Sequence, residues 1–204
     1  MGELTLTTFL TLDGVMQAPG GPTEDTSGGF AYGGWLVPHA DADMGGAMVD
    51  IFSKAGAFLI GRGTYDIFAA HWPKVTDPND PVAAKLNSLT KYVASRSRDK
   101  FDWKHSKHVK DVVKDIANLK AQTDGELQVH GSAGLAQTLI EHDLIDEYRL
   151  FVFPVVLGQG KRLLGSSARP ANLKMVSTKT TGKGTVISTY RRGEPFKSGS
   201  FALT

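Results

Sequence analysis

Cysteine is absent from this chain of 204 residues. A protein without thiols forms no disulfides, no thiolate metal sites and no cysteine nucleophile, and it suits a reducing compartment such as the cytoplasm, which is the expected location. An excess of one charge is also lacking, because 23 Lys and Arg stand against 21 Asp and Glu. This balance provides no basic face, so we expect no nucleic acid among the partners.

Long apolar runs are missing as well. No segment approaches the length of a membrane span, and no basic flank precedes an apolar stretch near Met1. We therefore expect no membrane partner. With 41% hydrophobic residues the chain can bury a full core. We predict a single domain over residues 1–192 and a tail over 193–204 that is poorly ordered unless it docks on a partner.

Strand-like and helix-like segments alternate along most of the sequence, which indicates an α/β fold with parallel strands. Strands are predicted at 4–12, 57–60, 92–95, 127–130 and 147–157. Helices are predicted from Asp41 or Asp43 to Phe52, from Thr64 onward, and at 81–89, 109–119 and 132–142. Residues 171–192 hold two Thr- and Val-rich strands around Gly182-Lys-Gly184, a hairpin that would place antiparallel strands at one sheet edge.

The most informative segment is the turn Gly61-Arg-Gly-Thr64. A buried strand ending at Ile60 leads into it, and Thr64 can cap the helix that follows. A glycine turn at a helix N-terminus presents free backbone amides to an anion, and Arg62 adds a permanent charge. The alternative is an ordinary strand-turn-helix junction with a surface arginine.

Two further turns follow predicted parallel strands, where open α/β sheets bind ligands. Ser95 and Arg96 place a hydroxyl and a guanidinium at one strand end, although a polar surface loop is the alternative. In the other, a strand meets the small residues 131–135, whose amides a pyrophosphate could approach. Neither turn is the GxGxxG fingerprint, and the first strand leads into Leu12-Asp-Gly-Val15 instead, which disfavours a standard Rossmann domain.

The ordered set of motifs resembles dihydrofolate-reductase-like proteins, most of all the C-terminal reductase domain of the bifunctional riboflavin-biosynthesis deaminase-reductase and its stand-alone relatives. The resemblance covers about residues 4–192. It implies a three-layer α/β fold, with a mixed, mostly parallel sheet, helices on both faces and an antiparallel C-terminal edge. The motifs that carry it are Thr11-Leu-Asp-Gly-Val15, Gly61-Arg-Gly-Thr-Tyr-Asp66, Tyr92-Val-Ala-Ser-Arg96, Gly131-Ser-Ala-Gly-Leu135, Leu144-Ile-Asp-Glu147 and Pro154-Val-Val-Leu-Gly-Gln-Gly-Lys161.

The resemblance also implies an NADPH site across the strand ends. Its residues fall into three groups: those at the cofactor's phosphates, Gly61, Arg62, Gly63 and Thr64; those beside the adenosine 2′-phosphate, Ser95 and Arg96; and those that hold the pyrophosphate and border the nicotinamide, Gly131, Ser132, Ala133, Gly134 and Leu135. Arg96 is the residue expected to select NADPH over NADH.

The chemistry this implies is hydride transfer to an electrophilic C=N or C=O group of a small-molecule substrate. Asp13 is the catalytic candidate, because family members place this Leu-Asp-Gly turn beside the nicotinamide and the substrate. Its alternative is a structural turn residue. Trp35 and Trp72 are the candidates for stacking on an aromatic substrate, and either could instead belong to the core. His130 could face the cofactor or be a buried, satisfied histidine.

Departures from the family's sequence pattern limit the range of possible substrates. The helix position that holds the pterin in folate-reducing enzymes falls near Gly45, with Asp43 two residues earlier, which argues against dihydrofolate. The deaminase half is absent, since a cysteine-free chain cannot form its zinc site. Residues 16–43 contain no Lys or Arg, so a phosphorylated substrate would need Lys161 and Arg162, unless these are merely solvated.

These inferences predict an NADPH-dependent reductase for a small heterocyclic or ribosylamine-like substrate, similar to 5-amino-6-(5-phosphoribosylamino)uracil reductase. The alternative is a nucleotide-binding scaffold without turnover, acting as a sensor or interaction module. We expect no metal, because the Asp residues at 41 and 43 are explained by a helix start. A homodimer is expected, with the apolar strand from Tyr148 to Leu157 pairing across a two-fold axis.

Overall fold

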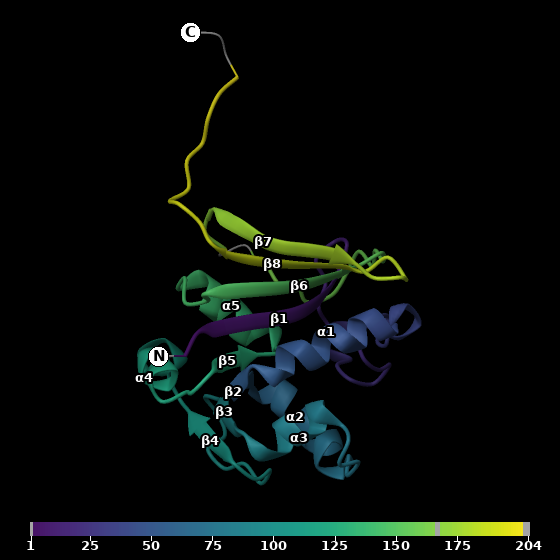
Figure 1. Cartoon of the computed structure of the whole chain (residues 1–204), viewed down its shortest axis with the longest axis vertical. Helices are drawn as coiled ribbons and strands as arrows, with labels where there is room; N and C mark the ends of the chain where they lie inside the picture. Colours follow the sequence, from purple (N-terminus) through teal and green to yellow (C-terminus); the bar gives the residue numbers. More distant parts are fainter. Residues whose placement is uncertain (1, 166–167, 202–204) are drawn as a thin grey trace.

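The computed structural model describes residues 2–165 and 168–201, and eight strands of these residues form one sheet (Figure 1). The order across the sheet is β4-β3-β2-β5-β1-β6-β8-β7. The strands are β1 (Leu4–Thr11), β2 (Ala55–Gly61), β3 (Thr90–Ala94), β4 (Ser106–Val109), β5 (Glu126–Val129), β6 (Glu147–Phe153), β7 (Leu173–Thr180) and β8 (Val186–Arg192).

Pairing in the sheet is parallel from β4 to β6 and antiparallel at the other edge. β6 pairs with β8 and β8 pairs with β7 in antiparallel register. The connection of β7 to β8 turns at Gly184, whose φ of 84° lies in the left-handed region that favours glycine. The predicted C-terminal hairpin and the mixed, mostly parallel sheet are therefore confirmed.

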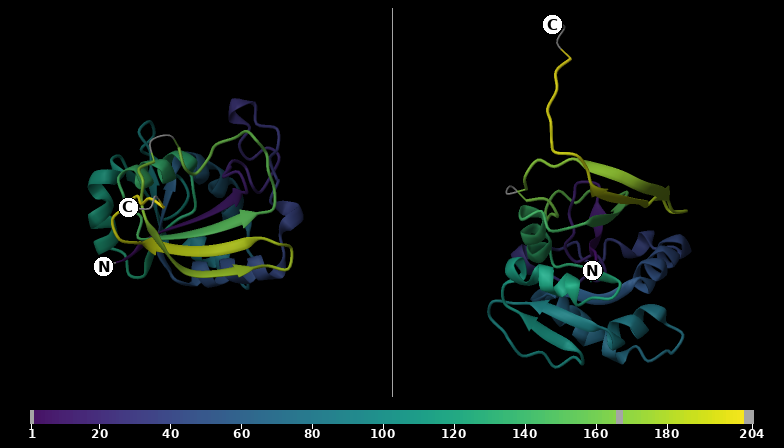
Figure 2. Two further views of the ribbon diagram at one scale, coloured as in Figure 1. Left: turned by 90° about the horizontal axis from the view of Figure 1, so that it is seen from above. Right: turned by 60° about the vertical axis from the view of Figure 1, so that its left-hand side comes forward.

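Helices cover both faces of the sheet (Figure 2). α1 (Ala42–Ser53), α2 (Arg62–His71) and α3 (Pro81–Ser88) pack on one face, and α4 (Val112–Ala121) and α5 (Ala133–Glu141) pack on the other. Successive side chains of β2 point to opposite faces of the sheet and so join the apolar cores on both sides. Phe58 and Ile60 pack with Leu86 of α3, whereas Leu59 belongs to the cluster that contains Leu139 of α5. The three layers are thus those expected.

The helices begin in two different ways. Asp41, Asp80 and Asp111 cap α1, α3 and α4 by accepting hydrogen bonds from backbone amides at 2.9–3.3 Å. α2 and α5 begin after Gly61 and Ser132 with no side-chain cap. Thr64 had been predicted to cap α2, and that prediction is wrong, because the helix already starts at Arg62 and leaves Thr64 buried in its first turn.

Two other expectations need correction. Val109 was expected to open a helix, but it ends β4, an edge strand whose other residues are polar and lack strand-like alternation. The strand expected to reach Leu157 ends at Phe153, before Pro154, which cannot donate to a ladder. It also lies between β1 and β8, so it offers no free edge for pairing with a second copy.

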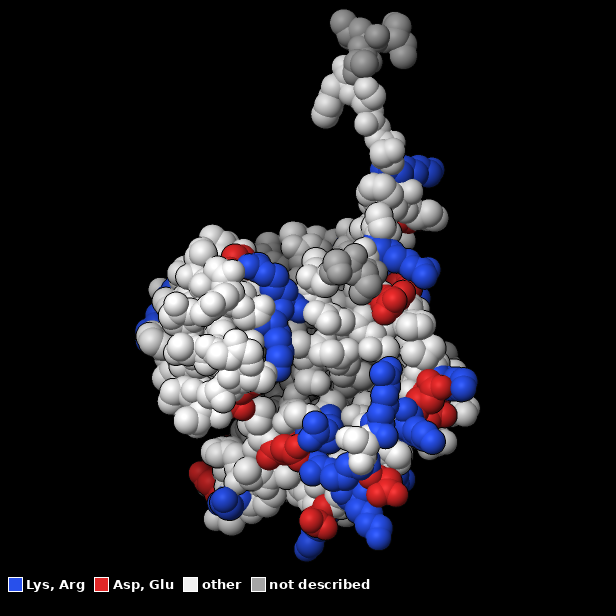
Figure 3. Space-filling view, turned by 180° about the vertical axis from the view of Figure 1, so that it is seen from behind, with Lys and Arg blue, Asp and Glu red and all other residues white. Residues whose placement is uncertain are grey.

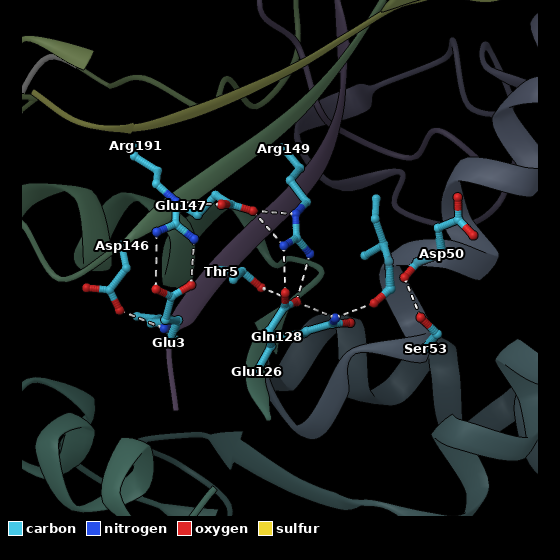
Figure 4. A network of polar contacts seen from close by, with 12 residues as sticks. Glu3, Thr5, Asp50, Ser53, Glu126, Gln128, Asp146, Glu147, Arg149 and Arg191 are labelled. Carbon is cyan, nitrogen blue, oxygen red and sulfur yellow. Dashed lines mark hydrogen bonds and ion pairs between the residues drawn. The ribbon is translucent and has the colours of Figure 1, made fainter. Parts of the chain in front are cut away.

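A polar network occupies the α1 face of the sheet near the strand N-termini (Figure 4). The buried Arg149 guanidinium donates to both oxygens of Glu126, at 2.7 and 2.8 Å, and to Glu147 at 2.7 Å. Glu147 also accepts from Arg191 at 2.8 Å, and Arg191 reaches Glu3 at the surface. The network joins β1, β5, β6 and β8 by charged hydrogen bonds.

The chain after β8 runs away from the sheet as far as it is described (Figures 1 and 2). Residues 193–201 contain neither helix nor strand, and Phe196 and Phe201 are exposed. Among the described residues, no helix has both the length and the apolar character needed to cross a membrane.

Candidate functional site

Two of the predicted turns touch at the carboxyl ends of the neighbouring strands β2 and β5. The Gly61 amide donates to the Gly131 carbonyl at 3.4 Å. A Cβ on Gly61 would lie 2.1 Å from the Ser132 Oγ, and one on Gly131 would lie 2.9 Å from the Thr64 Oγ1. The φ of Gly131, 105°, lies in the left-handed region that favours glycine, and a side chain at Gly61 would displace Ser132. The Gly131–Ser132 peptide bond is cis.

The same turns leave the first amides of α2 and α5 available. Neither helix has a side-chain cap, and a Cβ at Gly63 or Gly134 would meet nothing within 4 Å. The two helix starts thus combine free N–H donors, positive dipole ends and open space in front of glycines. Two adjacent starts of this kind suit an anion with more than one phosphate group.

The turn after β3 lies beside them, because β3 is the other neighbour of β2. The Ser95 Oγ accepts from the Arg98 amide at 3.0 Å, and the His108 ring lies 2.8 Å from the Ser95 carbonyl. Ser95 therefore shapes this turn, and its hydroxyl proton remains free to donate. Arg96 is exposed and forms no hydrogen bond or ion pair with residues 2–165 or 168–201.

The structure adds a charge cluster that the sequence did not reveal. Asp66 on α2 pairs with Arg62 at 3.5 Å and with Arg98 at 2.5 Å. The Arg98 guanidinium also stacks near Tyr65 and Phe101, while its Nε is buried without a partner. The i,i+4 spacing of Arg62 and Asp66 was a detectable signal, but only the fold brings Arg98 to them.

Asp13 is held in the turn after β1 by several hydrogen-bond donors. Its carboxylate accepts from the Thr11 Oγ1 at 2.7 Å, from the Gly158 amide at 2.9 Å and from the Leu157 amide at 3.2 Å. The Thr11 hydroxyl above all, together with these amides, lowers the pKa of Asp13 to about 2. The ionised side chain ties the turn after β1 to the segment after β6.

The two tryptophans predicted as substrate contacts lie outside the three turns. Trp35 is buried, donates from its Nε1 to the Gln17 carbonyl at 2.8 Å and packs edge-on against Phe153. Trp72 directly follows α2 and opens a short 3-10 turn (Trp72–Lys74), where Asn87 donates to its carbonyl at 2.9 Å and its ring packs edge-on against Phe68. Trp35 is therefore a core residue, and Trp72 is half-buried beside α3.

His130 also faces the interior. Its ring stacks on Phe52 with 4.5 Å between centroids and lies 3.1 Å from the Gln128 Oε1. Burial, with a smaller effect of the Arg149 charge, lowers the pKa of His130 to about 3, so the ring is neutral. His130 is thus a half-buried, neutral ring that packs between Phe52 and Phe58.

The first turn of α1 presents no carboxylate toward α2. The Asp43 carboxylate accepts from the Gly182 amide in the β7–β8 turn, and a Cβ at Gly45 would meet nothing within 4 Å. In the described part of the chain, no group of three or more His, Cys, Asp or Glu is arranged to hold a metal.

A separate groove of about 1030 Å³ opens between α2, α3 and the segment 98–105. Tyr65, Phe101 and Trp103 contribute aromatic surface to it, and Asp66 and Arg98 stand where it approaches the glycine turns. The turns after β2 and β5 do not line it.

The fold and the glycine turns at neighbouring strand ends define a dihydrofolate-reductase-like α/β protein. The chain belongs to the RibD C-terminal domain family, which matches residues 3–187. The resemblance stated from the sequence motifs is thereby confirmed.

Relatives and solved structures agree with this assignment. The uncharacterized protein YyaP of Bacillus subtilis (strain 168) is 30% identical over 190 residues, covering 92% of this chain and 94% of YyaP. A crystal structure of a protein assigned by name to riboflavin biosynthesis, from Shewanella sp. PV-4, superposes with a TM-score of 0.70 at 20% identity, over 94% of this chain and 99% of that one.

A third comparison is with a bifunctional enzyme. The diaminohydroxyphosphoribosylaminopyrimidine deaminase/5-amino-6-(5-phosphoribosylamino)uracil reductase of Thermotoga maritima superposes with a TM-score of 0.61 at 16% identity. The match covers 94% of this chain and 57% of the Thermotoga chain. At these identities the structural comparisons establish the fold, and the family membership associates the chain with reductase domains.

Proposed function

We propose that this protein is an NADPH-dependent reductase that transfers hydride to a small heterocyclic or ribosylamine-like substrate. Family membership supports the reaction class, since the Thermotoga relative is named as a reductase. The proposal adds the residues of this chain that would bind the cofactor, and it takes the cofactor, NADPH, from the family resemblance.

The observation that carries the proposal is the contrast between helix starts. Three helices begin with an aspartate cap, whereas α2 and α5 leave their amides unused at the point where Gly61 and Gly131 touch. A buried or half-buried helix end needs a partner for these donors. A pyrophosphate placed across the two starts would supply it, with Arg62 beside α2.

The residues of the three turns would bind and position the cofactor. Ser95 and Arg96 would hold an adenosine 2′-phosphate at the end of β3, while the amides of 132–135 would fix the pyrophosphate. When bound, NADPH would supply the hydride for reduction of a substrate C=N or C=O group. The proton that completes the reduction comes from a group other than Asp13, because that carboxylate is ionised and held by four donors.

The test is a calorimetric titration of the protein with NADPH and with NADH. We expect NADPH to bind more tightly, and Arg96→Ala to weaken NADPH binding by about 1.5–3 kcal/mol, roughly 10-fold to 150-fold, because a charged hydrogen bond to phosphate is lost. NADH binding should not change. Lys197→Ala in the exposed segment after β8 is the matched control for removing a surface cation.

Equal affinity for the two nucleotides would refute the 2′-phosphate contact, and binding of neither would refute the reductase proposal. NADPH binding without oxidation against a panel of cyclic imines and carbonyl compounds would favour the alternative, a nucleotide-binding scaffold without turnover.

A further inference from the structure

Two loops pack into one lobe beside the proposed cofactor turns. This loop lobe consists of residues 12–40, after β1, and 154–163, after β6. Their backbones are joined by hydrogen bonds from the Leu12 amide to the Val155 carbonyl at 2.7 Å and from the Met16 amide to the Lys161 carbonyl at 2.8 Å. Gln137 of α5 donates to the Arg162 carbonyl at 2.8 Å, so the lobe adjoins the helix that starts at the 131–135 turn.

The loop lobe contains very few cations. The first Lys or Arg of the whole chain is Lys54, so the long loop contributes none, and the second loop contributes Lys161 and Arg162. Seen from behind, the lobe on the left is mostly white, with a blue strip along a hollow and a few red atoms at its upper and lower ends, whereas blue side chains gather lower on the molecule (Figure 3).

Both cations are already paired with carboxylates of the long loop. The Lys161 Nζ lies 2.6 Å from Asp25, and the Arg162 guanidinium contacts Asp13 at 3.3 Å and donates to the Gly158 carbonyl at 3.3 Å. Backbone contacts hold these partners in place, since the Gln17 side chain donates to the Asp25 carbonyl and accepts from the Lys161 amide, both at 3.0 Å. With Glu24 also present, the lobe has more carboxylates than cations.

The start of α2 has the opposite balance. Arg62 and Arg98 share the single carboxylate of Asp66, and Arg96 has no partner among the described residues. This end retains positive charge for phosphate groups, whereas the loop lobe does not. A dianionic phosphate ester in the lobe would have to displace Asp25 or Asp13 and leave that carboxylate beside two like charges.

We propose that the Asp25–Lys161 and Asp13–Arg162 pairs are specificity elements which make the lobe accept an unphosphorylated, uncharged heterocycle and reject a phosphoribosyl compound. This inference rests on the proposed function, because it names the substrate class of the same site. It distinguishes this chain from the Thermotoga enzyme, which is named as the reductase of a phosphoribosylamino compound.

The test uses NADPH-saturated protein, so that the phosphate sites of the cofactor are filled. Ribose 5-phosphate and ribose are titrated in separate calorimetric experiments against the wild type, Asp25→Asn and the double variant Asp25→Asn/Lys161→Met. For the wild type we expect no saturable ribose 5-phosphate binding up to about 10 mM. Asp25→Asn frees the Lys161 ammonium and should gain at least about tenfold in affinity, and the double variant should lose that gain.

Three results would overturn the inference: ribose 5-phosphate binding by the wild type below about 1 mM, no gain in Asp25→Asn, or a gain that survives in the double variant. Turnover gives a second readout, with 5-amino-6-(5-phosphoribosylamino)uracil and its dephosphorylated form compared by NADPH oxidation. Faster reduction of the phosphorylated form by the wild type would also refute the inference while leaving the reductase intact. Failure to bind NADPH would refute the proposed function before any sugar is added.

Discussion

Removing the Arg149 guanidinium tests whether the buried polar network supports the sheet. The Arg149 side chain is 6% exposed, and those of Glu126 and Glu147 are 14% and 7% exposed. Arg149→Met keeps most of the side-chain volume but leaves two buried carboxylates without their main partner. Breaking a buried pair in this way costs about 3–5 kcal/mol. We expect a value near the lower end, because Glu147 retains Arg191 and Glu126 retains the Gln128 amide.

The loss should also depend on pH in a defined direction. Burial alone would raise the pKa of Glu126, but hydrogen bonds and charge from Arg149 hold it below its ordinary value. In the wild type this carboxylate therefore stabilises the fold above its unfolded pKa, and the contribution is lost as the pH falls. In Arg149→Met the pKa of Glu126 should rise, so that protonation in acid removes the unpaired buried charge. The difference in the free energy of unfolding between the wild type and the variant should therefore shrink as the pH falls.

The assay is urea unfolding followed by tryptophan emission, at neutral pH and at about pH 5, close to the carboxyl range. Arg191→Met is the matched control, because its guanidinium belongs to the same network but is 47% exposed and should cost less than about 1 kcal/mol. A free-energy loss in Arg149→Met no larger than that of the control, or one that does not shrink in acid, would refute the reasoning.

Three other predictions concern single sites. Burial lowers the pKa of the Lys91 ammonium to about 8. Between about pH 8 and 10 the unfolded chain therefore binds more protons than the folded protein, and the free energy of unfolding should rise with pH. Lys91→Met should remove this slope in unfolding measurements across that range. Because the pKa of Asp13 is depressed in the folded protein, Asp13→Asn should lower the melting temperature at neutral pH and match the wild type near pH 2 in circular dichroism melts. If Asp13 is structural, the pH–rate profile of this variant should keep the wild-type shape. We propose a homodimer that forms through β7, whose eight residues are all exposed. Light scattering should show a dimer for the wild type and a monomer for Val176→Lys. A monomeric wild type would refute the proposed dimer.

Local signals in the sequence were sufficient for most of the sheet. The apolar run ending at Ile60 and the glycines around Lys183 determine a buried strand and a hairpin through short-range chemistry. β4 escaped prediction because Ser-Lys-His-Val lacks alternation, and its strand conformation depends on pairing with β3. Tertiary contacts decided that element, not local propensity.

The candidate site shows the same division between local and distant causes. The glycine turns were recognisable because glycine itself is the requirement for close approach, as at Gly61 and Gly131. The role of Asp13 was not, since its amide donors lie 144 and 145 residues away. The position of Trp72 was not predictable either, because motif spacing gives its distance from the glycine turn but not the direction in which α2 leaves the strand end.

The arrangement implies that cofactor and substrate recognition can change independently. The proposed phosphate contacts belong to strand ends and helix starts, whose positions follow from the sheet itself. The loop lobe is held by hydrogen bonds between its own two segments, and its charges sit in side chains such as Asp25 and Lys161. Substitutions there alter the charge offered to a substrate without disturbing the β2 and β5 turns, because loops on a rigid scaffold tolerate change. Substrate differences within this family should therefore be sought first in residues equivalent to 12–40 and 154–163, where a single carboxylate decides whether a cation is free for phosphate.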